Sequence, residues 1–144
     1  MKQIKQLSLF VENRKGALAE VCRVLKAAEV NILAATVADT REFGILRLLT
    51  DDIAKGNAAL KAAGFITREN DVLAICVPDR VGGLAEVFDA TDKLGLSVEY
   101  MYAIPDRMSD KAIIVFCFDD QTVAAEKLTA AGFKLLDAAD IARN

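Results

Sequence analysis

The sequence contains one segment twice, and this internal repeat limits the possible folds more than any other feature. Residues 13–32 read NRKGALAEVCRVLKAAEVNI, and residues 79–98 read DRVGGLAEVFDATDKLGLSV. A shift of 66 positions places Gly16 on Gly82 and aligns the Leu-Ala-Glu-Val runs that follow. Self-similarity at a fixed spacing indicates two copies of one structural unit.

The repeat extends over the whole chain. After about residue 40 the shift becomes 68, so KAAGF at residues 61–65 aligns with TAAGF at residues 129–133. The second copy therefore carries a two-residue insertion, which we place around residues 104–110. A chain of 144 residues is long enough for two very small domains. We expect these domains to be residues 1–70 and residues 71–144.

Each copy shows the hydrophobic periods of strand, helix, strand, strand, helix and strand, in that order. In the first copy, strands are predicted at residues 6–11, 31–38, 43–50 and 65–68, and helices at residues 18–28 and from residue 53, with Asp51 or Asp52 as N-cap and Gly64 as helix stop. In the second copy, strands are predicted at residues 71–77, 97–103, 111–118 and 133–136, and helices at residues 84–94 and 122–131.

A βαββαβ unit must place both helices on one face of an antiparallel sheet, which predicts an α+β, ferredoxin-like fold for each copy. The helix-covered face would hold Leu7, Leu9, Val11, Leu46 and Leu48, with Leu73, Ile75, Val77, Ile114 and Phe116 as their equivalents. The opposite face is also apolar, because it carries Phe10, Ile45, Leu49, Cys76, Ile113, Val115 and Cys117. An apolar outer face indicates that something covers it. We therefore expect a homodimer in which sheets of two chains pack together.

Composition excludes several classes of function. The net charge of −3 gives no basic face for nucleic acid, and no apolar run is long enough to span a membrane or to act as a signal peptide. Cys22, Cys76 and Cys117 are far apart without CxxC spacing, which predicts reduced core thiols in a cytoplasmic protein.

The sequence contains no combination of residues that is typical of a catalytic site. The chain has no histidine, the usual general base, and no GxSxG elbow surrounds its serines. The carboxylate pairs at residues 51–52 and 119–120 stand directly before predicted helices, so we interpret them as helix caps. No spacing typical of zinc or calcium ligands occurs, and we expect neither a metal nor a cofactor.

The glycine loops at residues 13–18 and 79–84 are the candidate binding elements. Each loop leads from a strand end into a helix start, where backbone N–H groups are free and the helix dipole is positive. Such a place suits a carboxylate or a phosphate, and phosphate is the weaker choice because GxxxxGK[ST] and GxGxxG are missing. The alternative is that Gly16 and Gly82 only permit a tight turn.

The polar residues around the loops also allow two interpretations each. Glu20 and Glu86 lie near the first helical turn, where the dipole stabilises them or a ligand engages them. Arg14 and Arg80 either bind an anion or lie in water. The residues that open the second strands, Asn31 and Ser97, either hydrogen-bond a ligand or shape a turn.

Taken together, these motifs resemble the ACT domain family. Its usual pattern is Asp-Arg-Pro-Gly-x-Leu, a helix and then Gly-x-Asn-Ile, and here NRKGALAEV is followed by EVNI and DRVGGLAEV by GLSV. The resemblance covers both copies, so the chain is similar to a stand-alone tandem ACT protein. It implies two units side by side through their second strands, in one eight-stranded antiparallel sheet with helices on one face.

The resemblance also implies composite ligand sites, each joining the loop of one copy to the second strand of the other. One site would combine Asn13, Arg14, Lys15, Gly16, Ala17 and Leu18 with Ser97 and Val98. The other would combine Asp79, Arg80, Val81, Gly82, Gly83 and Leu84 with Asn31 and Ile32. The family's proline is replaced by Lys15 and by Val81. The second combination keeps more of the pattern, and we expect it to be the functional site if only one functions.

The resulting prediction is a non-catalytic protein that binds an amino acid and senses or regulates, with a metabolic enzyme as a possible partner. The alternative is a structural or protein-interaction module, a regulatory subunit whose ligand sites have decayed. An acylphosphatase on the same fold is disfavoured because its phosphate loop is missing. RNA binding is disfavoured by the charge and by the lack of surface aromatics.

Overall fold

Strand β1 (Ile4–Glu12) shows how the sequence pattern becomes structure. Leu7, Leu9 and Val11 are buried, whereas Phe10 and Glu12 between and beyond them are exposed. Successive side chains of a strand point to opposite faces, so the apolar set lies on one side. The computed structural model of the chain describes residues 3–39, 42–104 and 111–142, and the insertion expected around residues 104–110 lies almost entirely outside them.

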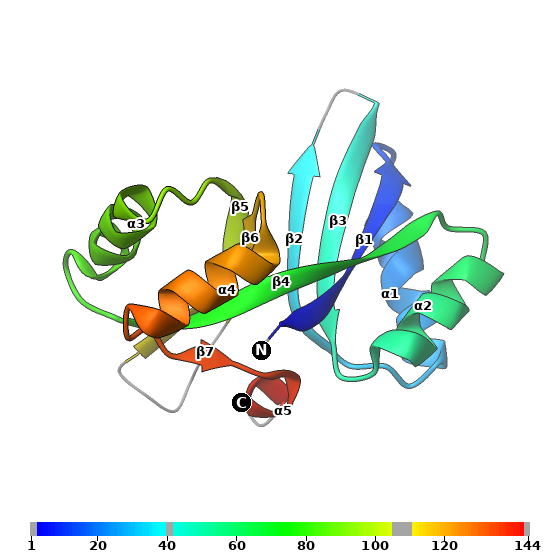
Figure 1. Cartoon of the computed structure of the whole chain (residues 1–144). Coiled ribbons are helices and arrows are strands. Elements are labelled where there is room, and N and C mark those ends of the chain that lie inside the picture. The colour runs from blue at the N-terminus through cyan, green and yellow to red at the C-terminus, as the bar shows by residue number, and fades with distance from the viewer. Residues whose placement is uncertain (1–2, 40–41, 105–110, 143–144) are drawn as a thin grey trace. The chain divides into compact units, whose positions relative to one another are not determined.

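The chain divides into two compact units between Asn70 and Asp71. One unit is Lys5–Asn70, and the other is Asp71–Asn144 together with the start of the chain up to Ile4. Each unit contains strand, helix, strand, strand, helix and strand, as the sequence predicts (Figure 1).

In the unit Lys5–Asn70, β1 is followed by α1 (Ala17–Ala27), β2 (Ile32–Asp39), β3 (Phe43–Thr50), α2 (Ile53–Ala62) and the first residues of β4 (Thr67–Pro78). The strands are ordered β4, β1, β3, β2, and β3 pairs antiparallel with both β1 and β2. This is the strand order of a split βαβ, ferredoxin-like unit. Helices α1 and α2 pack against each other (Figure 1).

In the other unit, the last residues of β4 are followed by α3 (Gly83–Lys93), β5 (Val98–Ile104), β6 (Lys111–Phe118), α4 (Gln121–Ala130), β7 (Leu135–Leu136) and α5 (Ala138–Ala142). The strands are ordered β7, β4, β6, β5, and β6 pairs antiparallel with β4 and β5. The order matches that of the first unit strand for strand.

Strand β4 is shared, and it changes the expected strand count. The strands predicted at residues 65–68 and 71–77 form one continuous strand, so the described residues contain seven strands where the family resemblance implied eight. No glycine or proline interrupts residues 67–77. The Ser8 hydroxyl also donates to Asn70 Oδ1 at 2.6 Å, which ties the middle of β4 to β1.

Helix α5 was not expected from the sequence. Its start is fixed by a reciprocal pair of hydrogen bonds, in which Asp140 N–H donates to Asp137 Oδ1 (2.9 Å) and Asp137 N–H donates to Asp140 Oδ2 (3.0 Å). This is the arrangement of a capping box with aspartates in both positions. Ile141 is the buried residue of the helix.

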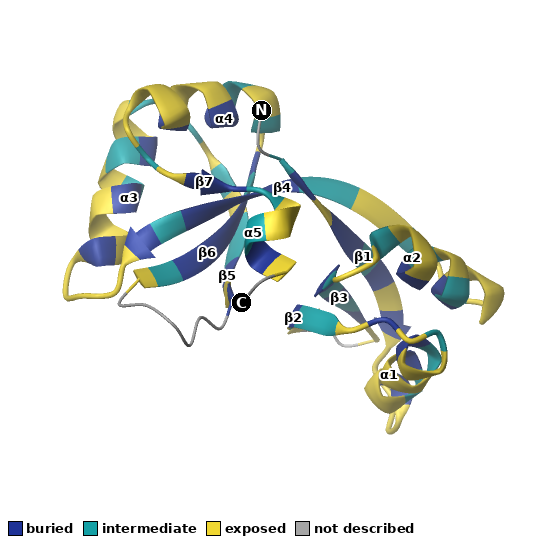
Figure 2. Cartoon of the chain, turned by 90° about the horizontal axis from the view of Figure 1, so that it is seen from below, coloured by how far each residue is buried: buried dark blue, intermediate teal, exposed yellow. Residues whose placement is uncertain are grey.

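Each unit has its own hydrophobic core between its helices and its sheet. The strand residues predicted for the helix-covered face all lie in these cores, and both predictions are confirmed. In the first unit, α1 contributes Ala17, Val21 and Leu25. Figure 2 shows the same division along the helices, which are buried on one side and exposed on the other.

Two details of the predicted core are wrong. The helical period of residues 18–28 predicts an apolar stripe through Leu18, Val21, Cys22, Leu25 and Ala28, yet Leu18 and Cys22 are exposed because the buried residues of α1 are Ala17, Val21 and Leu25. Cys22 is therefore not a core thiol, whereas Cys76 and Cys117 are half-buried. None of the three cysteines, which all lie among the described residues, forms a disulfide.

The outer face of the sheet differs between the copies. Phe10 is 55% exposed, whereas Ile113 and Val115 in the second copy are 2% and 0% exposed within the single chain. Leu49 is also buried. Much of the apolar outer face is thus already covered, and packing against a second chain stays a prediction that concerns the surface around Phe10.

Candidate functional site

The first glycine loop is a tight turn between β1 and α1. Arg14 N–H donates to the carbonyl of Glu12 (2.8 Å), and Ala17 N–H donates to the carbonyl of Arg14 (3.2 Å). Gly16 has φ 87° and precedes the helix as its N-cap. Glycine adopts this left-handed conformation at no steric cost, unlike residues with a Cβ atom.

The second copy forms the same turn from different residues. Arg80 N–H donates to the carbonyl of Pro78 (3.0 Å), and Gly83 N–H donates to the carbonyl of Arg80 (3.0 Å). Gly82 has φ 83°, within a few degrees of Gly16. The glycine and not the neighbouring side chains therefore fixes the loop geometry.

The helices that follow the loops differ from the other long helices in how they begin. Asp52 and Asp120 cap α2 and α4 by accepting from Lys55 N–H (3.0 Å) and Val123 N–H (3.1 Å), as predicted. In the described part of the chain, no side chain caps the first turn of α1 or α3. The first-turn N–H groups at both glycine loops can therefore serve an external acceptor, and the helix dipole favours an anionic one.

Each loop arginine is paired with a glutamate six residues later. Arg14 Nη2 lies 2.6 Å from Glu20 Oε2, and Arg80 Nη2 lies 2.6 Å from Glu86 Oε1. The hydrogen bond and the charge of Glu20 raise the pKa of Arg14 above its ordinary value. Sequence reasoning missed both pairs, although the equal interval in the two copies was the available signal.

The starts of the second strands are held by the first aspartate of each carboxylate pair. Asn31 N–H donates to Asp51 Oδ1 (2.9 Å), and Ser97 N–H donates to Asp119 Oδ1 (3.4 Å). Their carbonyls accept from the N–H groups of Asp51 and Asp119, each at 3.1 Å. The side chains of Asn31 and Ser97 are exposed, so a ligand could reach them.

Each unit thus contains one glycine loop and one strand start, which are the two parts that the predicted sites need. The loop of the first copy and the strand start at Asn31 and Ile32 belong to the unit Lys5–Asn70. The second loop and the strand start at Ser97 and Val98 belong to the other unit. The predicted combination of the loop of one copy with the second strand of the other copy stays a prediction.

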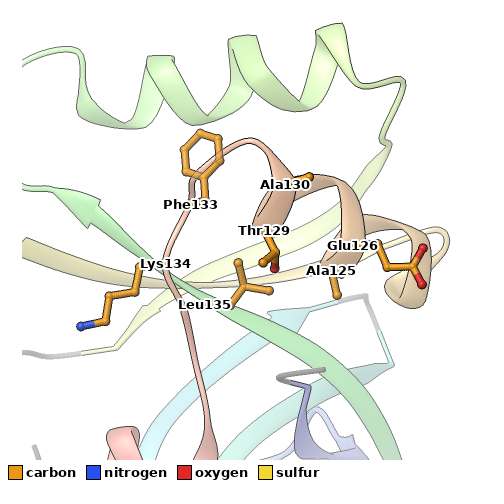
Figure 3. Close-up of a pocket in the computed structure, with 7 residues that line it drawn as sticks. All are labelled: Ala125, Glu126, Thr129, Ala130, Phe133, Lys134 and Leu135. Carbon is orange, nitrogen blue, oxygen red and sulfur yellow. The ribbon is translucent and has the colours of Figure 1, made fainter.

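A groove of about 640 Å³ also lies beside α4 and β7 in the second unit. Its walls are mostly apolar, with Ala125, Phe133 and Leu135 among them. Figure 3 shows the charged ends of Glu126 and Lys134 pointing away from each other. Because its polar groups do not converge, this groove is a poorer ligand site than the glycine loops.

Neither a metal centre nor a membrane span is found among the described residues. No group of three or more Cys, Asp or Glu side chains in residues 3–39, 42–104 and 111–142 could hold a metal ion. None of the helices in these ranges has the length and apolar character needed to cross a bilayer.

Comparison with known proteins identifies the repeat. A family model described as the ACT domain pair matches residues 2–143. The structure is similar to that of protein BT0572 from Bacteroides thetaiotaomicron, with 34% sequence identity and a TM-score of 0.90 over 96% of this chain and 95% of that chain. No curated protein matches the chain.

More distant structures share the fold. The regulatory subunit of aspartate kinase from Thermus flavus is 16% identical with a TM-score of 0.61, over 88% of this chain and 91% of that chain. The equivalent subunit from Thermus thermophilus, in ligand-free form, is 16% identical with a TM-score of 0.60, over 91% of each chain.

Proposed function

Because the chain belongs to the ACT domain pair family, we propose that it is a non-catalytic regulatory or sensor protein that binds an amino acid. Residues 1–70 and 71–144 each act as one ACT domain. The observation that carries the proposal is the pair of glycine loops, which share a left-handed N-cap and leave the following helix without a side-chain cap. Two such loops supply two places for a ligand carboxylate.

The composite site that joins residues 79–84 to Asn31 and Ile32 is the primary one. Backbone N–H groups at the start of α3 would donate hydrogen bonds to the carboxylate, and the exposed side-chain carbonyl oxygen of Asn31 would accept one from the ammonium group. The second site joins residues 13–18 to Ser97 and Val98. Val81, which stands at the family's proline position, is 99% exposed and would lie at the rim, where side-chain selectivity arises.

The regulated partner would be a metabolic enzyme in the cytoplasm. The similar fold of an aspartate kinase regulatory subunit supports this class of partner. A ligand regulates by binding one arrangement of the protein more tightly than another, which shifts the population between them. The ligand-bound form would then differ in its contacts with the enzyme or with a second copy of the chain.

A thermal-shift panel with each of the twenty amino acids at millimolar concentration tests the proposal. A ligand at a hundred times its Kd adds about 2.7 kcal/mol to the free energy of unfolding, which raises Tm measurably. We expect at least one amino acid to stabilise the protein. Absence of stabilisation by all twenty would contradict the proposal.

Two matched variants then locate the site. Val81→Glu and Lys15→Glu each place a carboxylate at an exposed loop position, where it would repel the carboxylate of a ligand. We expect Val81→Glu to abolish the stabilisation and Lys15→Glu to leave most of it. Equal responses of the two variants would mean that the second loop is not the primary site.

A second candidate function is an assembly module with decayed ligand sites. Exposure of Phe10 and the loss of the family's proline from both loops favour it. In that case no amino acid would stabilise the protein, and Phe10→Lys would reduce self-association measured by light scattering.

A further inference from the structure

We propose that the first copy holds a separate site for a small organic cation with an aromatic or branched apolar group. The geometry that points to it is a cavity whose wall combines exposed aromatic rings with two carboxylates. All of its residues lie within Lys5–Asn70, so the site does not need the second copy. It shares Arg14 and Ala17 with the proposed site at residues 13–18, and its other lining residues belong to neither amino-acid site.

The cavity has a volume of about 290 Å³ and lies where four segments meet. Its lining comes from the end of β1 with Arg14 in the loop after it, the first turn of α1, the first residue of β3 and the connection from α2 to β4. Small-molecule sites are mostly concave and apolar with a few placed polar groups, and their volumes begin at about 300 Å³. The size therefore suits a ligand of one ring or one branched chain.

The apolar part of the lining is unusually exposed. Phe10, Phe43 and Ile66 are 55%, 47% and 72% exposed and all line the same cavity. Scattered exposed apolar side chains are ordinary, but a gathering of large ones around a hollow indicates a binding surface. Phe65, which packs against the core of the unit, completes the wall.

The charged part of the lining carries an excess of negative charge. Arg14 Nε lies 3.3 Å from Glu12 Oε2, and Arg14 Nη2 lies 2.6 Å from Glu20 Oε2. Two carboxylates thus surround one guanidinium, which leaves a net charge of −1. Each contact engages one carboxylate oxygen, so the second oxygen of each glutamate can accept from an ammonium donor.

The strand register places aromatic rings beside this charge. Glu12 on β1 lies directly opposite Phe43 on β3, and Phe10 lies two positions earlier on the same face as Glu12. A cation between a carboxylate and the face of an aromatic ring is attracted by both. The cavity thus offers a place for the charged end and the apolar end of one ligand.

The second copy has the same backbone positions with opposite chemistry. Cys76 N–H donates to the carbonyl of Lys134 (3.0 Å), as Phe10 N–H donates to that of Ile66 (3.4 Å). Pro78 lies opposite Lys111, as Glu12 lies opposite Phe43. Phe43 and Ile66 are therefore replaced by Lys111 and Lys134, and Glu12 is replaced by Pro78.

The local charge is reversed as a consequence. At the positions equivalent to the cavity lining, the second copy carries Arg80, Lys111, Lys134 and Glu86, whose formal charges sum to +2, whereas those of Glu12, Arg14 and Glu20 in the first copy sum to −1. An organic cation that binds the first copy would be repelled by the second. The chain thus contains its own control for the proposed site.

Titration with phenethylammonium, followed by backbone amide NMR shifts, tests the proposal on the full chain. We expect saturable binding with shifts gathered at residues 10–20, 43 and 63–66, weakened by added salt. 3-Phenylpropionate has the ring but the opposite charge, and we expect it not to bind there. Absence of saturable phenethylammonium binding, or equal binding of both probes, would overturn the proposal.

Variants separate the charge from the apolar wall. Glu12→Gln should weaken phenethylammonium binding about fivefold, in line with one exposed charge contact. Phe43→Lys introduces the residue type of the second copy and should abolish binding. Glu86→Gln, which removes the equivalent pair from the second copy, should change nothing, and Phe43→Lys with unaltered binding would exclude the site.

Two further measurements distinguish the proposed cation site from a dimer contact and from the amino-acid site. Light scattering shows whether phenethylammonium dissociates a dimer of the chain. Dissociation would mean that a second copy of the chain occupies the cavity, which would overturn the proposal. Val81→Glu should leave phenethylammonium binding intact even where it removes amino-acid stabilisation. Loss of both together would place the cation at the amino-acid site and contradict a separate one.

Discussion

At the scale of single residues, the two loop glycines do more than terminate a strand. Gly16 and Gly82 have φ values of 87° and 83° and stand in loops that otherwise differ in charge and size. Their conformation directs the first-turn N–H groups of α1 and α3 away from any side-chain cap of the described residues. Among the loop residues, Gly16 and Gly82 therefore have the strongest influence on the backbone conformation, because they lack a side chain.

We expect Gly82→Ala to lower the free energy of unfolding by about 1–2 kcal/mol, the cost of a left-handed residue with a Cβ atom. No atom lies within 4 Å of the added Cβ, so the loss comes from backbone conformation alone. Urea denaturation measures it, and Gly16→Ala should give a similar loss because its Cβ also meets open space. A loss well under this range in both variants would mean that the loops relax into another conformation.

At the scale of secondary-structure elements, each copy uses two long helices, of which one has a side-chain N-cap and the other has none among the described residues. The caps Asp52 and Asp120 occupy equivalent places before α2 and α4, and the aspartates before them close the starts of β2 and β5. The same acidic pair thus serves two elements at once. These hydrogen bonds account for the presence of both aspartate pairs without a role in metal binding or catalysis.

Removal of an N-cap carboxylate should lower the free energy of unfolding, whereas removal of an exposed carboxylate that caps no helix should leave it nearly unchanged. Asp120→Ala should lower the free energy of unfolding by about 1 kcal/mol, because the N–H of Val123 loses its acceptor. Asp89→Ala is a matched control, since Asp89 is exposed within α3 and away from its first turn. Thermal or urea denaturation of both variants makes the comparison, and equal losses would contradict the capping role.

The sequence predicted most elements because their hydrophobic periods are strong, as in β1 and α1. It predicted the glycine loops because the repeat marks them. It did not predict the continuity of β4, because the repeat places the boundary between the two copies at Asn70 and Asp71. It did not predict the helix α5 either, because the start of α5 depends on the hydrogen bonds between side chains and backbone of Asp137 and Asp140. The pairing of Arg14 with Glu20 was missed as well, although the same six-residue interval between Arg80 and Glu86 was available as a signal.

At the scale of the whole molecule, duplication kept the backbone and changed the surfaces. The two units share strand order, loop geometry and helix caps, yet Phe10 is exposed where the second copy has the half-buried Cys76. An apolar pattern on an outer sheet face predicts that it is covered, but it does not say by what. The burial of Ile113 and Val115 within the chain shows that the two copies are not equivalent candidates for a dimer surface.

Substitution by lysine at two outer-face positions separates folding from assembly. Val115 is fully buried between its partners Ala74 on β4 and Tyr102 on β5, so Val115→Lys forces a charge into an apolar environment and should lower the free energy of unfolding by several kcal/mol. Phe10→Lys places its charge at an exposed site and should leave Tm nearly unchanged. Under the alternative function as an assembly module, it would also shift a dimer toward monomer. Calorimetry and light scattering at matched concentrations measure the two effects. A well-folded Val115→Lys variant that loses self-association would instead place the dimer contact on the second copy.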